Sequence, residues 1–109
     1  MFGFGKREPI REVTPGQLHE MIASREAVVV DVREPGEFAG GHIPGAINLP
    51  LSRFDAGQLP DCPNGTIVLN CAAGRRSAMA LRKCKDVPVD THLRGGMGAW
   101  TRAGLPVER

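Results

Sequence analysis

The sequence predicts an α/β fold with a central, mainly parallel β-sheet flanked by helices. Residues 27–32 and 67–69 are apolar runs rich in β-branched side chains, which is typical of buried strands. Helix signals separate the predicted strands, and alternating strands and helices favour a parallel sheet. With 109 residues, 41% hydrophobic and 24% charged, the chain has the size and composition of one globular domain. We expect residues 1–8 to be a flexible tail and residues 9–109 to form the domain.

The first predicted elements are an edge strand over residues 10–13 and a helix that begins at Thr14 and reaches about Ser24. Thr14 can cap the helix, with Pro15 at the first helical position and Gln17 at the capping-box position. The run at residues 27–32 follows. Because it is continuously apolar, we expect both of its faces to be buried.

The middle of the chain is rich in glycine and proline, which predicts turns around short elements. We expect a short helix at residues 35–39, a short strand at 46–49, a further short helix at 51–59 and a loop at 60–65. The strand from Thr66 comes next.

Three elements are predicted to complete the fold. A helix is expected from Ser77, and a last strand over residues 87–92 at the sheet edge, where Pro88 would not interrupt a hydrogen-bonded ladder. A final helix begins near Gly95 and ends near Gly104, with a proline beyond it.

Cys71 lies at the turn from the 66–70 strand to the following helix. Unpaired backbone N–H groups and the positive end of the helix dipole favour a thiolate at such a position. Cysteines in such surroundings have pKa values of about 3.5 to 7.5, compared with about 8.5 for a free thiol. Ligands of parallel sheets also bind at the carboxyl ends of the strands. We therefore predict that Cys71 is a nucleophile.

The residues after Cys71 support a binding loop. Ala72, Ala73 and Gly74 are small enough for the backbone to wrap around the sulfur, and glycine tolerates left-handed backbone conformations. Two arginines, Arg75 and Arg76, indicate a small anionic substrate. The alternative is that the cysteine is a small buried apolar residue at the end of a strand.

Composition argues against several other classes of protein. The net charge of +2, without a basic run interleaved with aromatic residues, argues against a nucleic-acid partner. Cys62, Cys71 and Cys84 are odd in number and lack CxxC spacing, which argues against a disulfide scaffold or a metal site. Neither a signal peptide nor a stretch long enough to span a bilayer is apparent, so we expect a cytoplasmic protein without a membrane partner.

Three stretches of the sequence resemble single-domain rhodaneses: DVREPGEFAGGHIPGAINLPL at residues 31–51, NCAAGRRS at 70–77 and LRGGMGAWTRAGLPV at 93–107. The resemblance implies a rhodanese-like domain and a thiosulfate sulfurtransferase-like enzyme. Its cysteine would take a sulfane sulfur from a donor such as thiosulfate, hold it as a persulfide and pass it to cyanide or a thiol. The implied partners are the small anionic donor, this acceptor and thioredoxin-like or other sulfur-relay proteins. Neither a cofactor nor a metal is implied.

The resemblance also assigns the site residues. The active-site cysteine corresponds to Cys71, and its substrate-binding cradle to the residues that follow it: Ala72, Ala73, Gly74, Arg75, Arg76 and Ser77. The six positions from Cys71 to Arg76 match the loop length of rhodaneses, whereas related phosphatases and arsenate reductases use one residue more. An arsenate reductase or phosphatase on the same scaffold, and a non-catalytic sulfur-carrier or interaction module, remain alternatives.

The other polar side chains are predicted to be structural. His42 lies in a GHIPGA turn, and Asp31 and Arg33 are expected to form a buried or loop-fixing polar pair. Surface or packing roles are expected for His19 and His92, and a core position for Trp100.

The two remaining cysteines differ in what they could do. Cys84 is more than three helical turns beyond Cys71 and cannot reach it, since a helix rises about 1.5 Å per residue. Cys62 lies in a loop, and whether it acts as a resolving thiol for Cys71 is left open.

Overall fold

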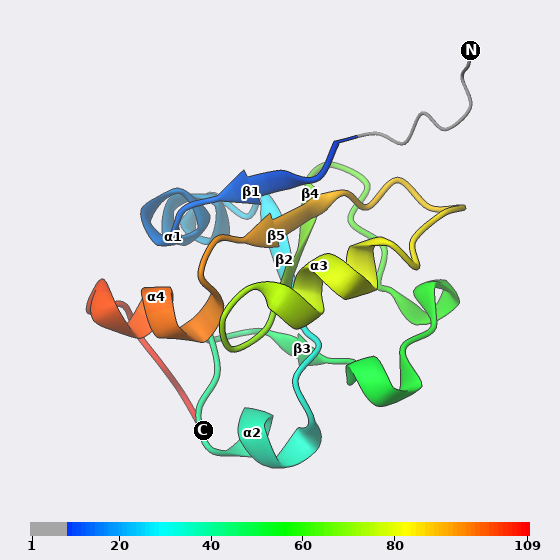
Figure 1. Cartoon of the computed structure of the whole chain (residues 1–109). Helices are drawn as coiled ribbons and strands as arrows, with labels where there is room; N and C mark the ends of the chain where they lie inside the picture. Colours follow the sequence, from blue (N-terminus) through cyan, green and yellow to red (C-terminus); the bar gives the residue numbers. More distant parts are fainter. Residues whose placement is uncertain (1–8) are drawn as a thin grey trace.

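The computed structural model describes residues 9–109, and the predicted tail at residues 1–8 lies outside this range. Within the described range, one five-stranded sheet has the strand order β1-β5-β4-β2-β3, and every strand pair is parallel. Helices cover both faces of the sheet (Figure 1). The predicted fold class is therefore confirmed. The strands are β1 (Arg11–Val13), β2 (Ala27–Asp31), β3 (Ile47–Asn48), β4 (Thr66–Asn70) and β5 (Thr91–Leu93). The helices are α1 (Pro15–Ala23), α2 (Pro35–Ala39), α3 (Arg75–Leu81) and α4 (Gly96–Arg102), with 3₁₀ turns η1 (Leu51–Arg53) and η2 (Ala56–Gln58).

The centre of the sheet is the parallel pair β2 and β4, in register from Ala27 beside Thr66 to Asp31 beside Asn70. Their last residues, Asp31 and Asn70, are fully buried. This burial on both faces agrees with the prediction from the apolar run at residues 27–32. Because β4 ends at Asn70, Cys71 is placed at the carboxyl edge of the sheet.

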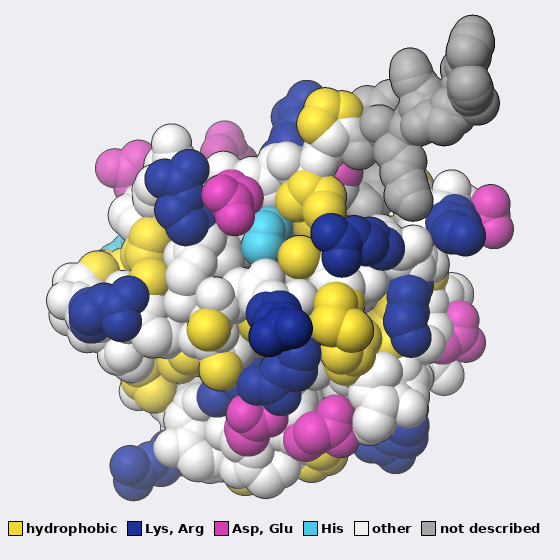
Figure 2. Space-filling view, in the orientation of Figure 1, with side chains coloured by type: hydrophobic (Ala, Val, Ile, Leu, Met, Phe, Trp, Pro, Cys, Tyr) yellow, Lys and Arg dark blue, Asp and Glu magenta, His cyan; other side chains and the backbone are white. Residues whose placement is uncertain are grey.

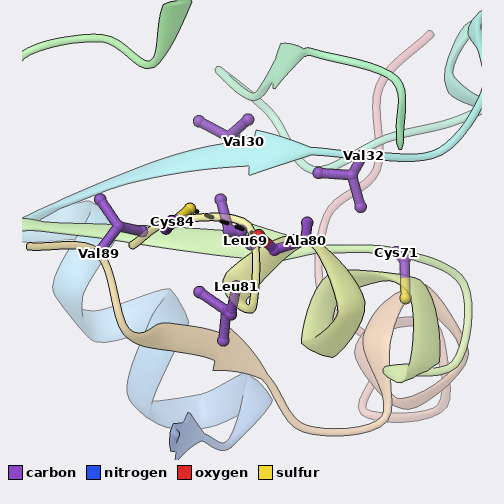
Figure 3. Close-up of a cluster of buried hydrophobic side chains, with 8 residues drawn as sticks. All are labelled: Val30, Val32, Leu69, Cys71, Ala80, Leu81, Cys84 and Val89. Carbon is purple, nitrogen blue, oxygen red and sulfur yellow. Dashed lines mark hydrogen bonds between the residues drawn. The ribbon is translucent and has the colours of Figure 1, made fainter. Parts of the chain in front are cut away.

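Two apolar clusters fill the space between the sheet and its helices. One packs β2, β4 and β5 against α1 and α4, and contains Leu18, Val29, Ile43, Val68, Leu93, Met97 and Trp100. The other packs the opposite face against α3 and the η1–η2 segment (Figure 3), and contains Val30, Val32, Leu69, Cys71, Ala80, Leu81, Cys84 and Val89. The core position predicted for Trp100 is confirmed. Cys71 thus borders a packed core on one side and the loop on the other.

The start of the domain follows the sequence signals closely. β1 lies at the sheet edge, as predicted. Thr14 Oγ1 accepts from the Gln17 N–H at 3.2 Å, and Gln17 Oε1 accepts from the Thr14 N–H at 2.9 Å. This reciprocal capping box starts α1 where the sequence predicted it.

The last strand differs from its prediction in both bounds and position. β5 begins at Thr91, after Pro88, and lies between β1 and β4 rather than at an edge. An interior strand needs N–H donors on both sides, which a proline cannot provide. The proline therefore marks the loop before the strand, and the edge is taken by β1.

The helix predicted at residues 51–59 is replaced by the separate turns η1 and η2. Phe54 and Asp55 between them are extended, and Asp55 accepts a hydrogen bond from the Gly57 N–H at 2.9 Å. An aspartate that caps its own neighbour competes with continued helix. The apolar side chains of this segment, including Phe54, still pack onto the core.

α3 begins at Arg75, two residues before the predicted start at Ser77. Gly74 precedes it with φ of 99°, a left-handed conformation that glycine adopts without strain. The early start places Ser77 in the first helical turn, where its N–H donates to Cys71 Sγ. None of the helices between residues 9 and 109 has the length and hydropathy that a membrane span requires.

Candidate active site

The sulfur of Cys71 is enclosed by the loop that follows it. The residue is fully buried, and its Sγ accepts hydrogen bonds from the Gly74 N–H at 3.1 Å and the Ser77 N–H at 3.3 Å. Ser77 Oγ lies 3.5 Å from the same sulfur. Main-chain N–H groups aimed at one atom form a site that favours a negative charge.

The pKa of Cys71 reflects two opposing effects. Burial raises it, but hydrogen bonds from the Ser77 side chain and from the backbone of Ser77, Ala73 and Gly74 outweigh burial, so the net pKa is lowered. For Cys84, burial alone raises the pKa. The loop therefore favours a thiolate at Cys71, whereas the other buried cysteine is held as a thiol.

The N-terminus of α4 supports the loop from behind. The Met97 N–H donates to the Cys71 carbonyl at 2.8 Å, and the Gly98 N–H donates to the Ala72 carbonyl at 3.0 Å. Gly96 has φ of 58°, and a Cβ at this position would overlap the Cys71 carbonyl oxygen. Sequence reasoning assigned this segment only to a helix start. The run of glycines was the available signal of a close backbone approach.

The two loop arginines have different surroundings. Arg76 binds Glu37 of α2 through two hydrogen bonds, of 2.7 and 2.9 Å. The hydrogen bond from this guanidinium lowers the pKa of Glu37 to about 2. Arg75 is exposed, and neither an ion pair nor a side-chain hydrogen bond joins it to another residue within 9–109. Arg76 is thus held in place by α2, while the Arg75 side chain is free to contact a ligand.

Lys and Arg side chains stand at the centre of the molecular face that carries the Cys71 loop and α3 (Figure 2). Arg75 and Arg82 are exposed at opposite ends of α3. A cationic surface above a site for anionic sulfur favours approach of anionic ligands.

The polar residues predicted to be structural do hold the scaffold. Arg33 binds the Asp31 carboxylate at 2.9 to 3.1 Å and donates to the Gly41 carbonyl at 2.7 Å. The His42 ring stacks on Phe38 with 3.8 Å between ring centroids, and its Nδ1 lies 2.8 Å from the Phe38 carbonyl. These contacts fix the turns that follow β2.

His92 has surroundings that the sequence did not predict. It is 3% exposed, its Nδ1 lies 2.7 Å from Ser77 Oγ, and its Nε2 lies 3.2 Å from the Glu12 carboxylate. Burial lowers the pKa of His92, and Glu12 opposes that effect. The expected packing position is correct, but the ring also touches a residue of the Cys71 loop. Because the contact depends on the β1–β5 pairing and on α3, no local motif could reveal it.

The other thiols lie away from the loop. Figure 3 shows Cys84 and Cys71 at separate ends of the core cluster, and the Cys84 Sγ lies 3.5 Å from the Ala80 carbonyl. Cys62 precedes β4, whereas Cys71 follows it. Five strand residues span about 16 Å at about 3.3 Å each. Neither thiol is therefore placed to pair with Cys71.

A buried loop cysteine whose sulfur accepts hydrogen bonds from main-chain N–H groups, at the carboxyl edge of a parallel sheet, defines an α/β protein with a cysteine-centred anion-binding loop. The family model described as Rhodanese-like domain matches residues 14–103. The chain belongs to this family.

Relatives within the family differ in length and in name. A protein from Synechocystis is 43% identical over 96 residues, which is 86% of this chain and 54% of that protein. A protein named Sulfurtransferase from Allochromatium vinosum is 34% identical, covering 90% of this chain and 94% of the relative. Two Mycobacterium tuberculosis proteins named probable adenylyltransferase/sulfurtransferase MoeZ are 37% identical, but the match spans 25% of their length. The chain thus spans about half the length of the Synechocystis protein and a quarter of the length of the MoeZ proteins.

Solved structures show the same fold. A rhodanese-related protein from Thermoplasma volcanium superposes with a TM-score of 0.77 at 32% identity, covering 90% of this chain and 97% of that one. A thiosulfate sulfurtransferase from Pseudomonas aeruginosa gives a TM-score of 0.78 at 28% identity, covering 92% of this chain and 20% of that one.

Proposed function

We propose that this protein is a sulfurtransferase that carries a sulfane sulfur as a persulfide on Cys71. The thiolate attacks the outer sulfur of a donor such as thiosulfate, the donor S–S bond breaks, and sulfite leaves with the bonding electron pair. A cyanide or thiolate acceptor then attacks the outer sulfur of the persulfide, and the Cys71 thiolate is released. We propose thiosulfate-like anions as donors and thiols, including those of thioredoxin-like proteins, as acceptors.

The observation that carries this proposal is the pair of main-chain hydrogen bonds from Gly74 and Ser77 to Cys71 Sγ. Preorganised N–H groups stabilise an anionic sulfur without reorganising during the reaction. The outer sulfur of a persulfide is also anionic, so the loop suits both forms of the residue. The names of the Allochromatium and Pseudomonas relatives support the same chemistry.

The surface above the loop supports an anionic donor. Arg75 is exposed at the first position of α3, next to the loop in the sequence, so its charge can draw thiosulfate toward the site. Cys62, Cys71 and Cys84 are free thiols, which agrees with the reducing cytoplasm that we propose as the location.

Intact mass after incubation with thiosulfate tests the proposal. We expect the native protein and a Cys62→Ser control to gain one sulfur atom that cyanide removes. Cys71→Ser, shown by circular dichroism to be folded, should gain none. A sulfur atom retained by Cys71→Ser would contradict the mechanism. Gain without transfer to any acceptor would indicate a sulfur carrier instead, and turnover of arsenate or an aryl phosphate would indicate the alternative enzymes.

A further inference from the structure

The Cys71 thiol has no direct contact with solvent in the closed loop. The residue is 0% exposed, yet it must lose a proton before it can act as a nucleophile. A proton that leaves such a sulfur needs a hydrogen-bonded route through the protein. The structure contains one that ends at the surface.

The route crosses three elements. Cys71 Sγ lies 3.5 Å from Ser77 Oγ on α3, and this oxygen lies 2.7 Å from His92 Nδ1 on β5. The other ring nitrogen, Nε2, lies 3.2 Å from the Glu12 carboxylate on β1, whose side chain is 41% exposed. In Figure 2 a histidine stands beside an acidic side chain over β1 and β5.

The hydrogen-bond directions along this route agree with one another. A carboxylate can only accept, so the neutral His92 ring carries its proton on Nε2, facing Glu12. Nδ1 is then an acceptor for the Ser77 hydroxyl. The Gly74 carbonyl competes for that hydroxyl proton at 3.3 Å, but the contact with Nδ1 is much shorter. The serine oxygen is left free to accept from the Cys71 thiol.

We propose that Ser77, His92 and Glu12 form a proton relay that takes up the Cys71 proton and holds it as an imidazolium beside Glu12. The S–H bond breaks and its electron pair stays on sulfur. Ser77 Oγ gains that proton while its own hydroxyl proton passes to His92 Nδ1. The serine is unchanged, and the charges that appear are a thiolate and an imidazolium. His92 and Glu12 act through Ser77 and are positioning residues. This relay rests on the proposed role of Cys71 as the nucleophile.

Burial disfavours a positive charge on the His92 ring, and the negative charge of Glu12 opposes that effect. Glu12 faces the ring from β1, and the Cys71 sulfur lies behind Ser77. Arg94 binds the far oxygen of Glu12 at 3.2 Å, and Leu69 of β4, which pairs with His92 in the sheet, is apolar. The thiolate and the imidazolium stabilise each other, so the two groups titrate as a coupled pair.

The test is the pKa of Cys71, measured without any sulfur donor from the ultraviolet absorbance of the thiolate, with Cys71→Ser as the blank. We expect Ser77→Ala and His92→Asn to raise this pKa by about one unit, and Glu12→Gln to raise it by less. Through-space repulsion between Glu12 and the thiolate predicts the opposite sign for Glu12→Gln, since removing a negative charge favours the thiolate. The sign therefore separates the relay from simple electrostatics.

A second His–Glu pair provides the matched control. His42 Nε2 lies 3.5 Å from the Glu108 carboxylate, and the other nitrogen of this ring meets a backbone carbonyl rather than the loop. Glu108→Gln should leave the Cys71 pKa unchanged. An unchanged or lowered Cys71 pKa in folded Glu12→Gln would overturn the relay. A native Cys71 pKa in His92→Asn would also overturn it, because the asparagine side chain can still accept from the Ser77 hydroxyl but cannot take up a proton. If the variants shift the Cys71 pKa as expected but the native protein forms no persulfide, only the proposed function is refuted.

Discussion

The Arg76 guanidinium and the Glu37 carboxylate form a two-point ion pair that joins the Cys71 loop to α2, with N–O distances of 2.7 and 2.9 Å. Parallel hydrogen bonds of this kind fix the orientation of both groups. The arginine at the end of the loop is thereby a structural support.

Glu37→Gln should destabilise the protein at neutral pH. The pKa of Glu37 falls from 4.5 to about 2 on folding because Arg76 donates to its carboxylate. The stabilisation is therefore complete above the unfolded pKa and is lost as the pH falls through about 2. The pair is partly exposed, so we expect a loss of about 0.5 kcal/mol at neutral pH. Urea unfolding of both proteins at several pH values would measure it.

The matched control for this measurement is Glu20→Gln, on an exposed position of α1. It should follow the native protein at every pH. A Glu37→Gln difference that persists unchanged to the lowest accessible pH would show that the lost stability is not electrostatic.

Arg75→Gln should weaken thiosulfate binding while leaving the chemistry of the sulfur intact. Opposite unit charges about 4 Å apart in water attract by about 1 kcal/mol, so KM for thiosulfate should rise about fivefold. Steady-state kinetics with thiosulfate and with a neutral organic trisulfide would compare the two donors. Arg82→Gln, at the other end of α3, is the control and should match the native enzyme. If Arg75→Gln raised KM equally for both donors, Arg75 would not act by attracting the anionic donor.

Gly96→Ala should disrupt the Cys71 loop. The position has φ of 58°, and its new Cβ would overlap the backbone of Cys71 and Ala72. Alanine at a positive φ costs more than about 1 kcal/mol, and here the loop must also move. We expect the midpoint temperature of thermal unfolding to fall and less persulfide to form on Cys71.

Gly98→Ala, in the same helix, provides the comparison for that change. Its Cβ would meet Arg102 Nη1 at 3.4 Å, on a flexible side chain that can move, and the Ala72 carbonyl oxygen at 3.5 Å, which is an ordinary van der Waals distance. Near-native activity is expected. If both alanine variants behaved alike, the close approach at Gly96 would not be what holds the loop.

Cys84→Ala should lower stability but spare sulfur transfer. The side chain is 8% exposed and packs in the core cluster, so removing its sulfur should cost about 1 kcal/mol. Its pKa is raised by burial, so the native residue offers a thiol rather than a thiolate at neutral pH. Chemical unfolding and transfer rates would separate the two effects. Impaired transfer in a folded variant would assign Cys84 a place in the reaction.

Local patterns in the sequence determined a large part of this protein. The buried run at residues 27–32, the capping box at Thr14 and the placement of Cys71 at a strand-to-helix turn all depend on neighbouring residues. Two local inferences were wrong. The segment at residues 51–59 breaks at Phe54 and Asp55, and Pro88 precedes an interior strand.

Only the tertiary structure decided which distant residues meet. Arg76 finds Glu37 from a different helix, Gly96 touches the backbone of Cys71, and Glu12 reaches His92 across the β1–β5 pairing. The strand order that brings the first strand beside the last follows from how helices cover the two faces of the sheet, not from any one segment. Local sequence patterns identify which residues form strands, but which strands pair depends on long-range packing. The sequence alone therefore placed Cys71 at the turn between a strand and a helix, while the groups that support and surround it emerged from the fold.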